Sequence, residues 1–312
     1  MSQVAAASSR AAGRSVRIGI ALFLVAGVIF SAQDAISKVL ARDYDSPQII
    51  MVRFWAFGLF SVIYVSLRGG LGAAIRSRRP VLQVSRAILL IGEMMLFTFA
   101  LRFLGLAESH ALFATCPLLI TALAVPILGE HVGWRRWLGV GIGFLGALVI
   151  IRPGLGVFHP AALLTVSAAV GFAVYNLLTR LVSFHDRFET SLLYMGVVGG
   201  VAASLVGVPV WRTPDAHGWT LLAILSTTGI AGHLMLIKAL EFAPASLLQP
   251  FNYMMLVWAT TIGFLVFGDL PDAWTIAGAT MIVAGGAYVI WRERQIGRAH
   301  PAVIAQDPAA DG

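Results

Sequence analysis

Residues 26–40 read AGVIFSAQDAISKVL, and residues 168–182 read AAVGFAVYNLLTRLV. When the second segment is laid on the first, similar side chains coincide at Phe30 and Phe172, Asp34 and Asn176, and Lys38 and Arg180. A second match follows at almost the same spacing, where FALRFLGLAESH (99–110) lies on KALEFAPASLLQ (238–249). Two unrelated apolar segments can share hydrophobic residues by chance, but not polar residues at matched positions. The pattern therefore indicates an internal duplication.

The composition places this duplicated chain in a membrane. Of the 312 residues, 58% are hydrophobic and 12% are charged, and the mean hydropathy is +0.85. A soluble globular protein is typically about 45–50% apolar and about 25% charged. Ten helices of roughly 20 residues each would need about 200 residues, which this length provides. The composition argues against a cytosolic enzyme, a nucleic-acid-binding module or a disordered protein, and it makes the lipid bilayer the first expected partner.

Apolar windows and turn residues predict ten membrane-spanning helices, five in each copy. The predicted spans are 18–41, 48–68, 87–104, 106–128, 133–152, 160–182, 190–211, 219–240, 245–268 and 272–291. Because five is an odd number, the second copy enters the membrane in the opposite direction, as in the inverted repeats of secondary transporters. We therefore predict an all-α integral membrane protein in which two inverted five-helix repeats surround a central cavity. The expected parts are a cytoplasmic N-terminal segment (1–17), a first repeat (18–152), a second repeat (153–292) and a disordered cytoplasmic tail (293–312).

The 22 lysine and arginine residues set the expected orientation. Most of them fall in loops on one side, including Arg76 and Arg78, and Arg86 is placed with them just before the third span. Because positively charged loops stay in the cytoplasm, both termini are expected there. The net charge of +7 is assigned to these loops rather than to nucleic-acid binding. The single cysteine, Cys116, lies in an apolar run, so no paired-cysteine metal site is expected and no cofactor is predicted.

Three segments carry a resemblance to a known family. They are FSAQDAISKVLA (30–41), ALRFLGLAESHALFATCPLLITALAVPILGE (100–130) followed by GVGIGFLGALVIIRPG (139–154), and ALEFAPASLLQPFNYMMLVWATTIGFLVFGD (239–269). In these segments the chain resembles the EamA-type family of the drug/metabolite transporter superfamily, over about residues 18–292. The second copy departs from the pattern, because Asp269 stands where the first copy has a glutamate. The resemblance implies two inverted bundles around a central cavity, and transport of small organic metabolites across the bacterial inner membrane.

Ionisable side chains inside the predicted spans are the first candidates for a functional site, because a charge in lipid is costly. Asp34 in the first span and Arg53 in the second span are expected at similar depth. Arg53 is one expected partner of Asp34, and Lys38, one helical turn away, is another. A structural ion pair between the helices is an equally good interpretation of these residues.

Glu93 in the third span has no basic neighbour in the sequence. Carboxyl and imidazole groups both take up and release protons, so Glu93, His110 and His233 form a candidate proton-coupling set. Protons are accordingly an expected coupling ion. A lone histidine in an apolar helix is more often a packing or hydrogen-bonding residue, and this alternative holds for His233.

A second group of candidates is polar or aromatic and uncharged. Amide, phenol and indole groups around an apolar cavity suit an amphipathic organic ligand. The alternative is hydrogen bonding between helices, which contributes about 0.6 kcal/mol on average in membranes. The candidates are Tyr175 and Asn176 in the sixth span, Gln249, Asn252 and Tyr253 on one surface of the ninth, and the two tryptophans away from span ends, Trp55 and Trp258.

Two acidic residues are predicted to be structural. Glu130 and Asp269 each follow a glycine at the end of one helix and precede the next, where a carboxylate can cap the helix N-terminus. Glycines at matched positions are expected to give close helix contact, either inside the protein or at a homodimer seam. They are Gly139, Gly143, Gly146, Gly278 and Gly285.

Together these features predict a secondary active transporter, an exporter or a permease, that works by alternating access on small organic metabolites such as amino acids, riboflavin-like or nucleobase-like compounds. The alternatives are a membrane-embedded enzyme and a passive channel. The sequence offers no cluster with nucleophile or metal-ligand spacing, no filter motif and no phosphate-binding GxxxxGK[ST] loop. The protein is therefore not expected to be an enzyme.

Overall fold

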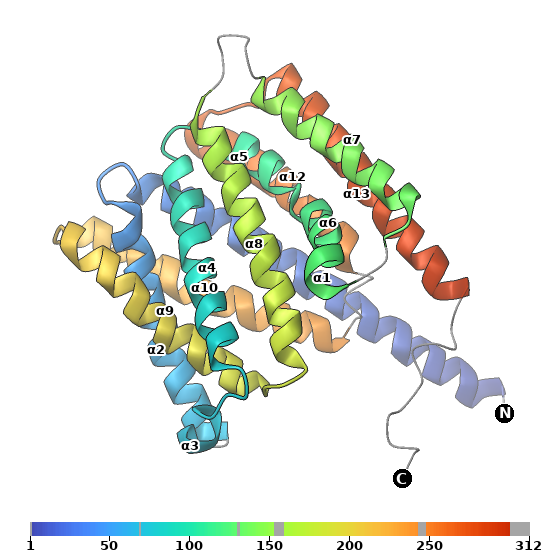
Figure 1. Cartoon of the computed structure of the whole chain (residues 1–312), viewed down its shortest axis with the longest axis horizontal. Coiled ribbons are helices and arrows are strands. Elements are labelled where there is room, and N and C mark those ends of the chain that lie inside the picture. Colours follow the sequence, from blue (N-terminus) through green and yellow to red (C-terminus); the bar gives the residue numbers. More distant parts are fainter. Residues whose placement is uncertain (1, 69, 130–131, 153–158, 243–247, 300–312) are drawn as a thin grey trace.

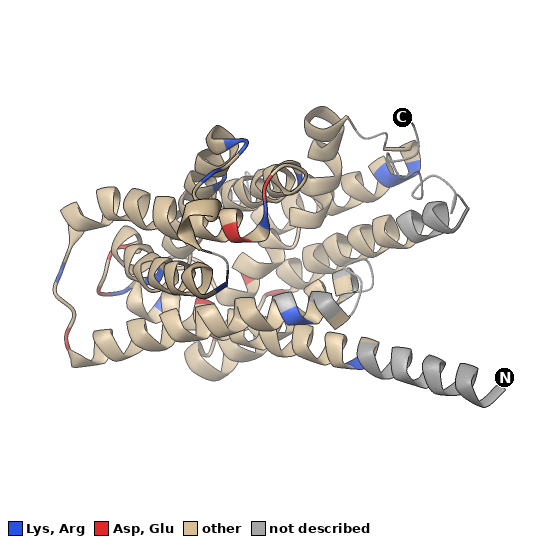
Figure 2. Ribbon diagram, turned by 90° about the horizontal axis from the view of Figure 1, so that it is seen from below, with Lys and Arg blue, Asp and Glu red and all other residues tan. Residues whose placement is uncertain are grey.

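The computed structural model describes residues 2–68, 70–129, 132–152, 159–242 and 248–299. Over these residues the chain is helical, with short connections and no strand. Within the described ranges, nine helices are long and apolar enough to cross a membrane, and a further apolar helix, Phe251–Phe267, is shorter. Charged residues are sparse along the helices and are separated by long stretches of other residues (Figure 2). The all-α membrane fold is thereby confirmed.

The helices of the first repeat follow one another with short turns. They are α1 (Ser2–Leu40), α2 (Ser46–Arg68), the short α3 (Leu71–Ala74), α4 (Pro80–Ala100), α5 (Leu106–Phe113) with α6 (Cys116–Leu128), and α7 (Trp134–Ile151). The second repeat contains α8 (Ala161–Ser183), α9 (Phe188–Gly207) with η1 (Val208–Val210), α10 (Ala216–Phe242), η2 (Gln249–Tyr253) with α12 (Met254–Phe267), and α13 (Ala273–Ala299). Each repeat thus supplies five spans, with α5–α6 and η2–α12 each forming one.

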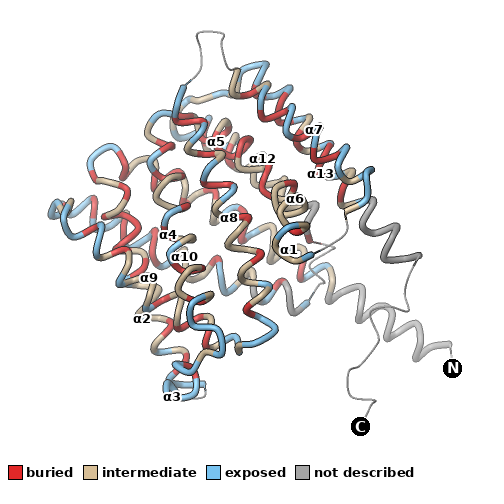
Figure 3. The backbone as a smooth tube through the Cα atoms, in the orientation of Figure 1, coloured by how far each residue is buried: buried red, intermediate tan, exposed pale blue. Residues whose placement is uncertain are grey.

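Helix packing follows a pseudo-two-fold relation between the repeats. The outer pairs α7–α13 and α2–α9 each join corresponding helices of the two repeats (Figure 1). Around the centre, α1 packs on α10 as α8 packs on α4, and α1 packs on α12 as α8 packs on α6. Exchanging each helix for its counterpart therefore reproduces the same set of contacts, which is what an inverted duplication requires. Exposed residues lie mostly on the outer sides of this bundle, and buried residues lie mostly toward its middle (Figure 3).

The crossing of α7 and α13 depends on glycines. A Cβ atom at Gly146 would lie 2.6 Å from the carbonyl oxygen of Gly278, and one at Gly139 would lie 2.9 Å from that of Gly285. These two contacts are equivalent, because Gly278 corresponds to Gly139 and Gly285 corresponds to Gly146. The glycines therefore serve packing inside the protein, which is one of the two interpretations predicted for them.

Matched glycines also end the fourth and ninth spans. Gly129 follows α6 with a φ of 68°, and Gly268 follows α12 with a φ of 71°. This left-handed conformation is accessible to glycine without steric cost, so both helices stop at the same point of their repeat. Asp269 does not cap the next helix, which corrects the prediction. The backbone N–H of Thr275 donates to Asp272 instead, at 2.8 Å, and Asp272 caps α13. Glu130 lies outside the described residues.

One predicted span begins at the wrong residue, and two helices continue beyond the spans predicted for them. Helix α4 begins at Pro80 rather than at residue 87, because proline suits the first turn of a helix, and Arg86 therefore lies within it. Helix α1 begins at Ser2, so most of the segment expected before the first span is also helical. Helix α13 continues to Ala299, so residues 293–299 are helical rather than part of a disordered tail.

Substituting Gly146 with alanine tests the α7–α13 contact. We expect Gly146→Ala to lower the free energy of unfolding by about 1–3 kcal/mol, because the new methyl group meets backbone that cannot move aside. Thermal denaturation in detergent measures this. Gly141→Ala is the matched control, since a Cβ atom there has nothing within 4 Å. Equal melting temperatures for the two variants would contradict the contact.

Candidate functional site

An intramembrane group of polar side chains, which we call the polar cluster, consists of Gln33, Asp34, Arg53, Glu93 and His110. Asp34 lies on α1, six residues before its end, or roughly 9 Å along the helix axis. Its Oδ2 atom is 3.0 Å from Nε2 of His110, and the His110 side chain is only 5% exposed. That Nε2 atom has no well-aligned hydrogen bond, so the contact is a close approach of two groups whose attraction depends on protonation of the imidazole.

Arg53 lies on α2, and its Nη2 donates to Oε1 of Gln33 on α1 at 3.0 Å. Arg53 and Lys38 are the predicted ion-pair partners of Asp34, but the group in contact with its carboxylate is His110. The predicted pairing is therefore wrong. Lys38 turns instead to Asp269, at 2.8 Å. Arg53 still lies within electrostatic range of both Asp34 and Glu93.

Glu93 extends the polar cluster toward the middle of the bundle. Its side chain is 7% exposed, and its Cβ atom lies close to Gly171 of α8, where a Cβ atom would be 3.1 Å away. The carboxyl group is within electrostatic range of Asp34, Arg53 and Cys116. Since Cys116 is the first residue of α6, Glu93 lies near the point at which the fourth span is interrupted.

Both repeats interrupt a helix at matching positions. The fourth span breaks at Ala114–Thr115, before α6, and the ninth span passes from a 3₁₀ turn ending at Tyr253 into α12. Transporters commonly build substrate and ion sites from such discontinuous helices, because the freed backbone groups face a cavity rather than lipid. Tyr253 and Glu93 both lie within electrostatic range of Cys116, the first residue of α6. The hydroxyl of Tyr253 and Nε1 of Trp258 are buried and have no hydrogen-bond partner among the residues that the structure describes.

The remaining polar candidates are less directly connected to the polar cluster. Nδ2 of Asn176 donates to the carbonyl oxygen of Phe172 on its own helix at 2.7 Å, and Tyr175 donates to Sδ of Met195 at 3.6 Å. Nδ1 of His233 lies 2.9 Å from the carbonyl oxygen of Gly229, and its ring contacts Phe30 and Phe57. Asn252 is partly buried in η2. The side chain of Gln249 lies outside the described part of the structure.

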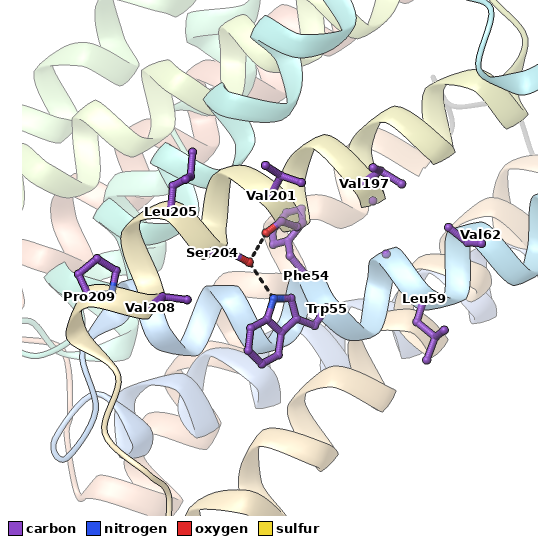
Figure 4. A pocket seen from close by; sticks show the side chains of 13 residues that line it. Phe54, Trp55, Leu59, Val62, Val197, Val201, Ser204, Leu205, Val208 and Pro209 are labelled. Atoms are coloured by element: carbon purple, nitrogen blue, oxygen red, sulfur yellow. Dashed lines mark hydrogen bonds between the residues drawn. The ribbon is translucent and has the colours of Figure 1, made fainter.

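Trp55 lies away from the polar cluster. It is 45% exposed and lines an apolar groove of about 730 Å³ between α2 and α9. Figure 4 shows its indole directed at Ser204 of α9, to which Nε1 donates at 2.8 Å. The groove faces outward, so Trp55 lies where lipid is expected rather than among the central candidates. The sequence hides this because nothing in it fixes how α2 is rotated about its axis.

Arg86 is a polar residue of the interior that the sequence analysis placed in a loop. It is 2% exposed, on α4, and its guanidinium donates to the side chains of Gln83 and Thr179 and to the carbonyl oxygen of Ser191. The guanidinium also lies over the ring of Tyr175, 5.8 Å from its centroid. Arg86 thus ties α4 to α8 and α9 at the end of the bundle opposite to Lys38. Seven residues before Glu93 on the same helix, it shares a face with that carboxyl, and this spacing is the signal that could have revealed it.

Asp186 completes the polar contacts at the Arg86 end. It accepts hydrogen bonds from the Ser77 hydroxyl, from the backbone N–H of Arg78 at 2.7 Å and from Nε2 of Gln83 at 2.9 Å. Desolvation acts to raise the pKa of Asp186, but these hydrogen bonds together hold the pKa below its ordinary value.

At the Lys38 end, three ion pairs surround a polar cleft of about 530 Å³. Lys38 contacts Asp269 and also donates to the carbonyl oxygen of Leu104 at 3.0 Å. The other pairs are Arg102 with Asp45, at 3.3 Å, and Arg152 with Asp272. Partial burial acts to raise the pKa of Asp272, but hydrogen bonds from Thr275 and Arg152 hold it below its ordinary value. The Lys38–Asp269 and Arg152–Asp272 pairs each join one repeat to the other.

Comparison with known proteins gives consistent results. The sequence model of the EamA-like transporter family matches residues 17–152 and 159–291. The chain is 27% identical over 277 residues to an S-adenosylmethionine uptake transporter of Rickettsia prowazekii, covering 89% of this chain and 94% of that protein. It is 27% identical over 275 residues to a riboflavin transporter of Vibrio cholerae, covering 87% and 92%.

Two further proteins are similar to the chain. The chain is 25% identical over 272 residues to a pseudopaline exporter of Pseudomonas aeruginosa, covering 86% of this chain and 94% of that protein. A crystal structure matches the fold with a TM-score of 0.62 at 19% sequence identity, covering 88% of this chain and 98% of that chain. At this identity the crystal structure supports the fold alone.

A double-mutant cycle on Lys38 and Asp269 tests the ion pair between the repeats. We expect Lys38→Met and Asp269→Asn to be non-additive, with a coupling of about 0.5–3 kcal/mol in thermal unfolding, because Lys38 is only 13% exposed. The control is the same cycle on Arg187 and Glu189, whose pair is 3.8 Å apart with Arg187 76% exposed. That exposed pair should couple by less than about 1 kcal/mol. Equal coupling in both cycles would contradict a special role for Lys38.

The lowered pKa of Asp186 has a consequence for stability at acidic pH. A carboxylate whose pKa is lower in the folded protein stabilises it above the ordinary aspartate range, and this contribution disappears as pH falls through the folded-state pKa. We therefore expect Asp186→Asn to melt at a lower temperature than the natural protein at neutral pH, and the difference to shrink on acidification. Asp43→Asn, in the exposed turn after α1, is the control. A difference that does not change with pH would refute the assignment.

Proposed function

The chain belongs to the EamA-like transporter family, and from this premise we propose that it is a secondary active carrier of small organic metabolites. That it is a multi-pass membrane transporter follows from the family, from its transporter relatives and from its apolar helices. The finer proposal concerns the mechanism, which is alternating access of a site between the inverted repeats.

The observation that carries this proposal is the polar cluster itself. Asp34, Arg53 and Glu93 come from three helices of the first repeat and lie within electrostatic range of one another. Ionisable groups at this depth are expensive in lipid, so a carrier has reason to keep them only where they face a substrate, an ion or one another.

The ion pairs at the Lys38 end suggest how access to the polar cluster changes. Lys38 belongs to the first repeat and Asp269 to the second, so the pair must separate if the repeats move apart at that end. We propose that this end faces the outside of a bacterial inner membrane and that both termini face the cytoplasm, because the basic loops lie at the opposite end.

The relatives define the range of substrates to be tested. Their names specify S-adenosylmethionine, riboflavin and pseudopaline, which are small organic molecules. Both uptake and export occur among them, so direction is a separate question. We propose proton coupling through Glu93 and His110, which are the ionisable groups at the centre, while His233 lies beside Phe30 and Phe57.

Flux measurements in proteoliposomes test the proposed carrier. We expect uptake or counterflow of one or more labelled metabolites from the panel above, and we expect Asp34→Asn and Glu93→Gln each to reduce it by roughly ten-fold or more, a loss of about 1.4 kcal/mol. Glu189→Gln, in the first turn of α9 with a partly exposed side chain, is the matched control and should retain normal flux. Normal flux in both cluster variants, at equal amounts of folded protein, would remove the polar cluster from the transport mechanism.

A further inference from the structure

The polar cleft at the Lys38 end lies on the boundary between the two repeats. Its volume is about 530 Å³, and residues of both repeats line it. The first repeat supplies the end of α1, the turn after α4 with the start of α5, and the residue after α7. The second repeat supplies the turn between α12 and α13 with the start of α13. The inference drawn from this cleft rests on the proposed carrier function.

The charges of the cleft are divided between its two walls. Among the lining residues, the first-repeat wall carries three basic side chains and one acidic side chain, and the charged side chains of the second-repeat wall are acidic. They are Lys38, Arg102, Arg152 and Glu108 on the first wall, and Asp269 and Asp272 on the second. The two walls therefore have opposite net charge.

Two ion pairs hold the walls together. Nζ of Lys38 lies 2.8 Å from Oδ2 of Asp269, and Nη2 of Arg152 donates to Oδ2 of Asp272. In both pairs the cation belongs to the first repeat and the carboxylate to the second. If the walls separate, the first wall therefore loses the partners of two cations, and the second wall loses the partners of two carboxylates.

The other charged groups of the cleft keep their surroundings within the first repeat. Arg102 lies 3.3 Å from Asp45 and donates to the carbonyl oxygen of Tyr44 at 2.8 Å. Glu108 lies in the first turn of α5, where the helix dipole stabilises a carboxylate. Separation of the repeats therefore acts on the two ion pairs between the walls and leaves these groups as they are.

The carboxylates are the accessible halves of the two ion pairs. The side chains of Asp269 and Asp272 are 42% and 46% exposed, whereas those of Lys38 and Arg152 are 13% and 18% exposed. Water therefore reaches the acidic half of each pair, and a charged group of a ligand can arrive by the same route. A positive group on that ligand meets the carboxylates first, with the two cations directly behind them.

We propose that this cleft binds compact zwitterions, such as amino acids, in which an ammonium and a carboxylate are attached to the same carbon. The ligand carboxylate binds Lys38 and Arg152, and the ligand ammonium binds Asp269 and Asp272. Because a carboxylate has two acceptor oxygens and an ammonium has three donors, one zwitterion can replace both ion pairs. Binding therefore favours separation of the walls, because the ligand makes these contacts only when the pairs have opened.

Ligands of other charge fit the separated walls less well. An organic cation would leave the two basic groups without a partner, and an anion would leave the two carboxylates without one. An uncharged molecule would leave all four groups unpaired. Since each charged group that loses its partner is costly, the cleft discriminates through the charges that a wrong ligand leaves unsatisfied.

Titration of the purified full-length protein with the protein amino acids tests this proposal. For each amino acid that binds, the methyl ester lacks the negative charge and the N-acetyl derivative lacks the positive charge. We expect both derivatives to bind roughly ten-fold or more weakly than the parent amino acid, since each loses hydrogen bonds to charged groups.

The same ligands assign each charge to its wall. We expect Lys38→Met and Arg152→Gln to reduce the preference for the amino acid over its methyl ester and to keep the preference over its N-acetyl derivative. Asp269→Asn should do the reverse. Both ligands meet the same altered protein, so any effect of the lost ion pair on stability cancels in the ratio of the two dissociation constants. Asp43→Asn, in the exposed turn after α1, is the matched control and should keep both preferences.

The proposal is overturned if no amino acid binds, if the derivatives bind as tightly as their parents, or if the preferences are the same in the cleft variants as in the natural protein. Preferences that Asp34→Asn abolishes and Lys38→Met leaves intact would place the zwitterion at the polar cluster instead, and would overturn it too. Each of these results leaves the carrier function standing if flux of any metabolite is observed. The carrier function itself fails only if no metabolite is transported.

Discussion

Hydrocarbon offers no hydrogen-bond partner and little stabilisation of charge, and the other features of this structure depend on that constraint. The backbone satisfies itself in helices, and the helices meet through glycines because apolar surfaces gain little from leaving lipid for one another. Charged residues are grouped in consequence. They form the polar cluster in the interior, the ion pairs of the Lys38 end and the contacts around Arg86 at the other end.

The sequence predicts well those features that depend on neighbouring residues or on the duplication. Apolar length predicts ten spans, and the repeat predicts that α6 and α12 end at corresponding glycines, which both adopt positive φ values. The small residues of α7 and α13 were recognised as contact positions because they recur at the same offset. In each case the signal is local in the chain or is repeated, so no knowledge of the three-dimensional neighbours is needed.

The partners of individual charges could not be predicted, because they depend on how helices distant in sequence are rotated against one another. Asp34 was expected to meet Arg53 or Lys38, but α5 presents His110 at 3.0 Å while Lys38 reaches the turn after α12. The direction of the Trp55 side chain could not be predicted for the same reason, since a half-turn of α2 decides whether it faces the interior or the outer groove. The sequence suggests a loop position for Arg86, because this arginine follows shortly after a proline. In the structure its guanidinium is enclosed by α4, α8 and α9.

The glycine crossing of α7 and α13 bears on the history of the chain. Gly146 contacts Gly278, which is the counterpart of Gly139, and Gly139 contacts Gly285, which is the counterpart of Gly146. One five-helix unit therefore already carries both surfaces of the crossing. A half-length protein could complete that crossing only with a second copy inserted upside down, and it would need to be produced in both orientations. In a single chain that holds both halves this requirement does not arise, and the halves are free to differ. Asp34 contacts His110, whereas its counterpart Asn176 donates to a carbonyl oxygen of its own helix, so corresponding positions of the two repeats carry different chemistry.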